Sequence, residues 1–178
     1  MKQLYSNPTT TNQRKAERKV IEMLKIVQLE GLQRPKDIGV ELTLRFDGKS
    51  DITTGTALYK HDQKQMIIKL HGKALETYED FIEDTVVHEF AHIIQFTNFP
   101  SAKPHGKTFK KLCRLFGGKQ DTTHKYDLKA LSPNKIKKFK HIYHCNCMEH
   151  EISPLIHGRM LKGQVRSCRN CKSNLVIK

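Results

Sequence analysis

Two histidines and a glutamate interrupt the apolar stretch TVVHEFAHIIQF, residues 85–96. Residues four apart lie on one face of a helix, so His88 and His92 are predicted to point at one metal ion. Glu89 lies about 100° around the helix and would reach the space beside that ion. The pattern His-Glu-x-x-His is typical of zinc peptidases in which the glutamate acts as a general base. Two core histidines held by backbone partners are the alternative interpretation.

A catalytic zinc ion needs three protein ligands and one open position. The loop NFPSAKPHGKTF, residues 98–109, offers His105 as the third ligand, and Gly106 is expected to permit a tight turn there. A metal-free histidine at the start of the next helix is the alternative. The 12 residues between His92 and His105 exceed the spacing of the metzincin pattern.

Four of the five cysteines form two pairs, Cys145-x-Cys147 and Cys168-x-x-Cys171, separated by 20 residues. This spacing predicts a closed structural zinc site in a short segment that has no other means of forming a core. The first pair is one residue shorter than usual, so His150 is an alternative to one of its cysteines. Together with the histidine site, the prediction is two zinc ions per chain, one catalytic and one structural.

The net charge of +14 lies entirely in the second part of the chain. Residues 1–100 carry 14 Lys and Arg against 14 Asp and Glu, whereas residues 101–178 carry 18 against 4. This segregation favours nucleic acid as a partner over an anionic membrane surface, and a merely solvated basic face is the alternative. The candidate phosphate contacts are basic residues in two groups: Lys107, Lys110, Lys111 and Arg114, then Lys135, Lys137, Lys138 and Lys140.

Phosphate contacts of this kind do not discriminate between bases, so binding should be independent of DNA sequence. The neighbouring aromatic residues Phe139 and Tyr143 are expected to stack on unpaired bases, which favours single-stranded or distorted DNA.

The hydrophobic pattern predicts an α+β protein whose elements position these residues. Residues 12–31 have apolar side chains at helical spacing, and residues 40–46 alternate as in a half-buried strand. GTALYK and QMIIKL, residues 55–60 and 65–70, are predicted to form a hairpin, which completes a three-stranded sheet of antiparallel type. QMIIKL is expected at the edge of the substrate cleft, where it would pair with the substrate backbone.

Two helices follow the predicted sheet. The helix with the two histidines is expected to begin near Thr77, where Thr77-x-x-Asp80 resembles a capping box, and to end before Pro100. The second helix, GKTFKKLCRLF, should end at Gly117 and bury Cys113 in the core.

We expect a flexible tail over residues 1–11, a catalytic domain over 12–133, and a basic linker with a zinc ribbon over 134–178. There is no apolar run of membrane-spanning length, and the polar, basic start has no signal-like apolar region. A cytoplasmic protein is therefore predicted, associated with the nucleoid if the chain is bacterial.

VVHEFAHIIQF, PHGKTFKKL and THKYDL, with the upstream TTGTALYKHDQKQMIIKL and the cysteine-bearing tail, resemble the SprT family of zinc-metallopeptidase-like proteins, which is related to the protease Spartan. The resemblance implies a minimal zincin-like fold with a C-terminal zinc ribbon, in which His88, His92 and His105 bind zinc and Glu89 is catalytic. His124 matches a family position, where it would stabilise an oxyanion or support the zinc site. A structural role is the alternative interpretation for His124, and the same two interpretations apply to Tyr126. Phe109 stands where family members often have tryptophan.

The expected function is that of a zinc-dependent endopeptidase acting on DNA-bound or DNA-crosslinked proteins, with DNA gating its activity. The alternative is a nucleic-acid-binding zinc-ribbon protein whose peptidase-like site is silent or regulatory.

Overall fold

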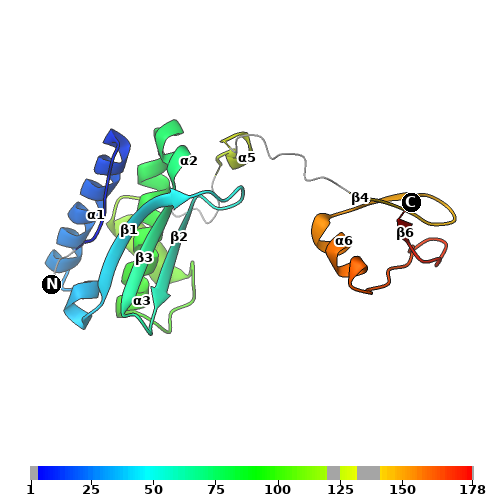
Figure 1. Ribbon diagram of the computed structural model, residues 1–178. Helices are drawn as coiled ribbons and strands as arrows, with labels where there is room; N and C mark the ends of the chain where they lie inside the picture. Colours follow the sequence, from blue (N-terminus) through cyan, green and yellow to red (C-terminus); the bar gives the residue numbers. More distant parts are fainter. Residues whose placement is uncertain (1–3, 120–124, 132–140, 178) are drawn as a thin grey trace. The chain divides into compact units, whose positions relative to one another are not determined.

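The computed structural model describes residues 4–119, 125–131 and 141–177, in two compact units, Met1–Ser132 and Pro133–Lys178. The first unit contains a three-stranded sheet with helices α1 to α5, and the second contains a smaller three-stranded sheet and helix α6 (Figure 1). This mixture of helix and sheet confirms the predicted α+β class. Within the described residues, no helix is both long and apolar enough to cross a membrane.

The sheet of the first unit consists of β1 (Glu41–Gly48), β2 (Gly55–Lys60) and β3 (Gln65–His71) in the order β1-β3-β2. The predicted antiparallel hairpin is confirmed as β2 and β3. β1, however, runs parallel to β3, so the prediction of an antiparallel-type sheet is wrong for this pair. The cause is that β3 returns between the first two strands instead of adding to the outside.

This strand order also changes which strand can border a cleft. β3 is central, so the prediction that QMIIKL forms the edge is wrong. Met66, Ile67 and Ile68 are all buried, and such a continuous apolar run is typical of a strand covered on both faces. The outer strand that packs against the helix carrying the two histidines is β2.

Helix α1 (Thr11–Leu29) covers the core with one apolar stripe. Its N-cap is Thr10, whose hydroxyl accepts a hydrogen bond of 3.2 Å from the Gln13 backbone N–H. The buried residues of the stripe are Ala16, Val20, Met23, Leu24 and Val27.

The helix with the His-Glu-x-x-His pattern begins later than predicted. Thr77 ends the short helix α2 (Gly72–Thr77), and its hydroxyl donates to the Lys73 carbonyl at 2.8 Å. The predicted capping box is therefore wrong. Helical structure resumes at Phe81, passes through the π-helical segment Ile82–Val86, and continues as α3 (Val87–Asn98).

Two further helices complete the first unit. α4 (Lys107–Leu115) packs against α3 and buries Phe109, Leu112 and Cys113. The chain leaves α4 through Gly117, whose φ of +77° is the left-handed conformation that commonly ends a helix. α5 (Leu128–Leu131) is a single turn.

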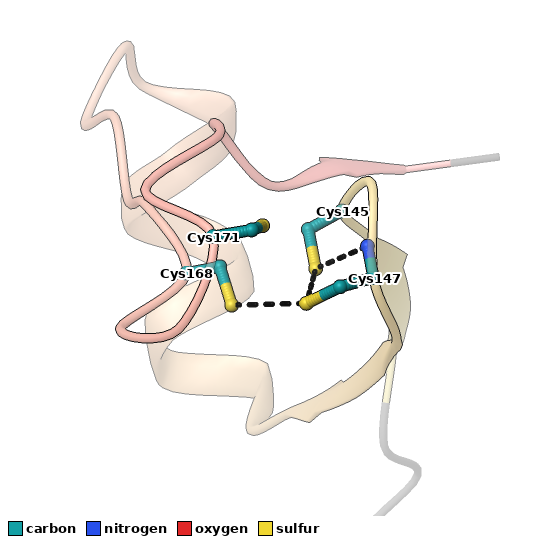
Figure 2. A group of neighbouring side chains, drawn as sticks. All are labelled: Cys145, Cys147, Cys168 and Cys171. Atoms are coloured by element: carbon teal, nitrogen blue, oxygen red, sulfur yellow. Dashed lines mark hydrogen bonds between the residues drawn. The ribbon is translucent and has the colours of Figure 1, made fainter.

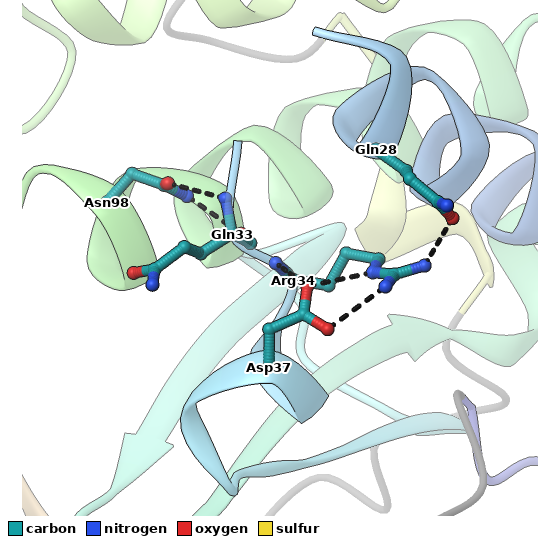
Figure 3. A network of polar contacts seen from close by, with 5 residues as sticks. All are labelled: Gln28, Gln33, Arg34, Asp37 and Asn98. Carbon is teal, nitrogen blue, oxygen red and sulfur yellow. Dashed lines mark hydrogen bonds and ion pairs between the residues drawn. The ribbon is translucent and has the colours of Figure 1, made fainter. Parts of the chain in front are cut away.

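A polar network holds the end of α3 against the segment that follows α1 (Figure 3). The Asn98 amide exchanges two hydrogen bonds with the Gln33 backbone, at 2.8 and 2.9 Å. Beside it, Arg34 pairs with Asp37 in the 3-10 helix Pro35–Ile38, and this hydrogen bonding lowers the pKa of Asp37. The network therefore joins α3 to the rest of the unit at the helix end opposite the π-helical segment.

Part of the expected flexible tail is attached to the sheet. Tyr5 donates to the Leu42 carbonyl and accepts from the Leu44 N–H, both at 2.8 Å, and Leu4 is buried. At these two residues the structure differs from the flexible tail expected over residues 1–11, because the outer edge of β1 offers unpaired backbone groups to the preceding chain. Residues 1–3 lie outside the described part of the chain.

The second unit has a small sheet with the order β5-β4-β6, built from β4 (His141–His144), β5 (Glu149–Ile152) and β6 (Val176–Ile177). Helix α6 (Pro154–Leu161) connects β5 to the second cysteine pair. Among the described residues of this unit, only Tyr143 and Cys168 are buried. The unit therefore has almost no hydrophobic core.

Candidate metal centres

Three histidine side chains from two parts of the first unit converge on one point. His88 and His92 lie one turn apart on α3, and His105 comes from the loop before α4. The Nε2 atom of His105 lies 3.0 Å from that of His92 and 3.1 Å from that of His88. The structure thus brings together all three histidines that the sequence suggested.

The spacing of these nitrogen atoms fits a metal ion. A tetrahedral ion with nitrogen ligands at about 2.0–2.1 Å separates those ligands by about 3.3–3.4 Å, close to the separations found here. Burial, reinforced by His88 and His105, lowers the pKa of His92 to about 4. His92 is therefore neutral near pH 7 and has a lone pair available for a cation.

Phe109 forms one wall of the histidine group. Its ring centroid lies 4.9 Å from that of His88, 4.3 Å from that of His92 and 4.8 Å from that of His105. Phe109 is fully buried, so it restricts the orientations of the three imidazoles. A bulky apolar residue at this position thus has a direct packing role.

Glu89 lies against the outer strand β2. Its side chain is only 8% exposed, and this burial raises the pKa to about 7, although a hydrogen bond from the Ala57 backbone N–H acts in the opposite direction. A Cβ atom at Gly55 would lie 2.6 Å from Glu89 Cγ and 2.9 Å from Oε1. Only glycine therefore leaves room for the glutamate at this point.

Gly55 and Ala57 were not among the site residues predicted from the sequence. The motif Gly-Thr-Ala was visible at the start of a predicted strand, but its contact with Glu89 depends on how β2 packs against α3. The role given to Gly106 also changes. The left-handed residue in the loop is His105, with φ of +56°, whereas a Cβ at Gly106 would lie 2.9 Å from the Lys103 carbonyl oxygen.

The second candidate centre is formed by Cys145, Cys147, Cys168 and Cys171, whose sulfur atoms all lie within 4.8 Å of one another (Figure 2). Cys147 Sγ is 3.4 Å from Cys145 Sγ and 3.7 Å from Cys168 Sγ. Tetrahedral coordination with bonds of about 2.3 Å would separate the sulfur atoms by about 3.8 Å. The cluster thus fits a closed site of four cysteines that could form a zinc ribbon.

His150, the alternative ligand, lies next to this cluster. Its Nε2 atom is 3.2 Å from Cys145 Sγ. A ring N–H at that distance would donate to a thiolate, as neighbouring groups of metal sites commonly do. His150 is therefore placed to support Cys145 when all four cysteines bind the ion.

The candidate DNA-binding residues fall into two sets with different outcomes. The set on α4, which follows His105 directly, is exposed to solvent. Its members are Lys107, Lys110, Lys111 and Arg114. The second set, Lys135, Lys137, Lys138 and Lys140, lies outside the described residues, as does Phe139.

Tyr143 does not have the exposed position expected of a base-stacking residue. It is 4% exposed, and its hydroxyl lies 3.2 Å from His157 Nδ1. The expectation that it stacks on DNA bases is therefore wrong, because the small second unit uses this ring as one of its few core side chains.

Other sequence candidates are placed as follows. Tyr126 donates a hydrogen bond of 3.0 Å to Asp80, next to the π-helical segment. His124 lies outside the described residues. The prediction for Cys113 is confirmed, since it is fully buried and its pKa is raised to about 12 by that burial.

Comparisons with known proteins agree with this arrangement. The SprT-like family model matches residues 20–130, which include the three-stranded sheet, helices α3 and α4 and the three histidines. Protein SprT of Escherichia coli (strain K12 / DH10B) and Protein SprT of Shigella boydii serotype 18 are each 34% identical over 106 residues, 58% of this chain and 61% of the relative. The chain thus spans less than two thirds of the length of these relatives. A search of solved structures found no match. The chain belongs to the SprT-like family.

Proposed function

We propose that the protein is a zinc-dependent endopeptidase with a minimal zincin-like catalytic unit. The observation that carries this proposal is the convergence of three imidazoles together with a buried carboxyl group, Glu89, which lies on the same helix between His88 and His92. A metal-binding site with a purely structural role has no need for a buried carboxyl group next to its ligands. Zinc is the ion we infer, because three histidines leave one coordination position open.

His88, His92 and His105 would hold the catalytic zinc, which would polarise a scissile carbonyl and lower the pKa of water toward neutrality. Glu89 would take a proton from the attacking water and deliver it to the leaving amine. Its pKa of about 7 suits both transfers, and a nearby cation would favour the ionised form that accepts the proton. Gly55 and Ala57 keep this carboxyl group in place.

Substrate would bind along β2, the outer strand next to Glu89. An extended peptide that adds to a sheet edge is held by backbone hydrogen bonds, so this mode selects weakly for sequence. An endopeptidase with such a cleft needs another source of selectivity.

DNA would supply that selectivity. Exposed lysines and an arginine on α4 follow the loop of His105, and the whole net charge of the chain lies after residue 100. We infer that this surface and the basic linker bind single-stranded or distorted DNA without sequence specificity, and that DNA gates cleavage of DNA-bound or DNA-crosslinked proteins. This function belongs in the cytoplasm, on the nucleoid in a bacterium.

The second zinc ion would be structural. The four cysteines of the second unit would hold it, with His150 beside Cys145. Because this unit has so few buried side chains, the ion would replace a hydrophobic core.

A different function is a nucleic-acid-binding ribbon protein whose peptidase-like site is silent or regulatory. The cysteine cluster and the exposed basic face of α4 fit this function as well as they fit an endopeptidase. It differs in requiring no reaction at Glu89.

The test is cleavage of a DNA-bound protein by the wild type and by Glu89→Gln, each with and without DNA. Glutamine keeps the shape but cannot accept the proton, so we expect activity to fall by about 100-fold or more while zinc content is unchanged. Equal cleavage by both proteins would refute the mechanism, and no cleavage by either would favour the ribbon-protein alternative. Equal wild-type rates with and without DNA would refute gating alone.

A further inference from the structure

The three candidate ligands are not held in the same way. His88 and His92 are fixed by the backbone of α3, whereas His105 lies in the loop between α3 and α4 and has a left-handed φ of +56°. Non-glycine residues adopt this conformation only when neighbouring contacts enforce it. Some contact must therefore hold the loop.

That contact comes from Gln95, one turn after His92 on α3. The side chain is 2% exposed, and its Nε2 atom donates to the Ala102 carbonyl at 2.9 Å and to the Lys103 carbonyl at 3.4 Å. Both acceptors belong to the loop, within three residues of His105. A single amide group on the metal-binding helix thus grips the segment that supplies the third ligand.

The gripped carbonyl also closes the turn that contains His105. The Lys103 oxygen accepts a hydrogen bond of 3.0 Å from the Gly106 N–H, so residues 103–106 form one turn with His105 inside it. A Cβ at Gly106 would lie 2.9 Å from this same oxygen, so the turn requires glycine after His105. Fixing the Lys103 carbonyl therefore fixes the position of the His105 backbone.

The oxygen atom of the same amide indicates that Gln95 is not at this position to stabilise the fold. Its Oε1 atom is buried and has no hydrogen-bond partner within the described part of the chain. A buried acceptor without a partner lowers stability, so an apolar residue of similar size would suit this position at least as well for packing alone. The donor group is the useful part of the side chain.

We propose that Gln95 is a positioning residue that preorganises His105 for metal binding. The inference rests on the proposed three-histidine metal site. Loss of the two donated hydrogen bonds should let the loop move, so that part of the binding free energy is spent on ordering His105. The effect should appear in metal affinity, in the absence of any substrate.

The experiment uses the full chain loaded with cobalt(II), because thiolate ligands give charge-transfer absorption that imidazole ligands lack, which separates the two sites. Gln95→Met keeps the length of the side chain and removes its polar atoms. We expect the dissociation constant of the histidine site to rise by about 10–100-fold, as for other groups that orient metal ligands. Affinity at the cysteine site should not change, and the Tm of the metal-free first unit should stay within about 2 °C or rise.

Asn98→Ala is the matched control on the same helix. Asn98 also hydrogen-bonds to backbone atoms, but two of these bonds go to Gln33 (Figure 3) and one to the Ile94 carbonyl on α3, and none goes to the loop. This variant should lower the Tm and leave the affinity of the histidine site unchanged. Gln95→Met should therefore weaken metal binding with little change in Tm, whereas Asn98→Ala should lower the Tm with no change in metal binding.

The outcomes separate the two proposals. Wild-type protein that binds cobalt only at the cysteines overturns the three-histidine site, and this inference with it. Wild-type protein that fills both sites, with equal histidine-site affinity in Gln95→Met, overturns the role of Gln95 alone. If Gln95→Met does not fold, Gln95→Leu is measured instead, because its side chain also lacks a donor, and the same loss of affinity is expected. Unchanged affinity in that variant also overturns the inference.

Discussion

The two candidate metal centres differ in what surrounds them. In the first unit, a continuous hydrophobic core holds α3, α4 and the sheet, and this core places the histidines. In the second unit, only Tyr143 and Cys168 are buried among the described residues, so little besides the cysteine cluster can hold the chain together. In the first unit the fold would therefore position the metal ligands, whereas in the second unit the metal would hold the fold together.

Removal of metal should separate the two units most clearly. The free energy of binding at structural zinc sites in small domains is about 10–16 kcal/mol and is also their folding free energy. A chelator should therefore unfold residues 141–177 and leave the first unit folded. Amide NMR spectra, recorded before and after chelation, measure this directly. Retained dispersion of the second unit's signals would contradict the comparison, and so would collapse of the first unit.

Gly55→Ala should have the next largest effect, confined to the first unit. The new Cβ would meet Glu89 Cγ at 2.6 Å, and overpacking of this kind costs about 1–3 kcal/mol. Displacement of the carboxyl group should also lower the proposed peptidase activity by about 10-fold or more, as misplaced catalytic groups do. Thermal unfolding and peptide cleavage give the two measurements.

Gly158→Ala in α6 is the matched control from the second unit. Nothing lies within 4 Å of a Cβ at Gly158, so alanine should be neutral or should stabilise the helix by up to about 1 kcal/mol. Similar losses in both variants would mean that the close approach of Gly55 to Glu89 has no special importance.

The share of DNA binding that each of the two basic sets contributes can be tested with two charge-reversal variants. One replaces Lys107, Lys110, Lys111 and Arg114 with Glu, and the other replaces Lys135, Lys137, Lys138 and Lys140. Each phosphate contact removed should weaken binding and reduce the slope of log affinity against log salt by about 1. Binding titrations at several salt concentrations, with circular dichroism as the folding control, measure both slopes. A wild-type slope in both variants would discard the proposed surface.

Thiol alkylation tests the comparison without altering the sequence, through a difference in reaction rate between cysteines. At pH 8, a pKa of about 12 leaves roughly one Cys113 thiol in 10,000 ionised. In metal-free protein the second unit is expected to be unfolded, so its four cysteines are exposed to water and should react at least about a thousandfold faster than Cys113. Mass spectrometry of timed samples counts the modified residues. Early modification of Cys113 would mean that the core of the first unit opens readily.

The sequence alone determined the features that depend on local spacing. The four-residue interval between His88 and His92 places both on one face of any helix, and the apolar residues between them predict that helix. The two cysteine pairs likewise predicted a cluster, which the structure contains. The hairpin and the stripe of α1 follow from periods of two and 3.6 residues, which are local properties of the chain.

Tertiary structure decided the contacts between segments that sequence periodicity does not relate. The insertion of β3 between β1 and β2 made β2 the strand next to Glu89, and this order depends on the whole sheet. The closeness of Gly55 to Glu89, the grip of Gln95 on the His105 loop and the burial of Tyr143 all depend on packing between distant elements. A hydrophobic pattern states which side of an element is buried, but many partners can bury it, and only the packed fold selects one.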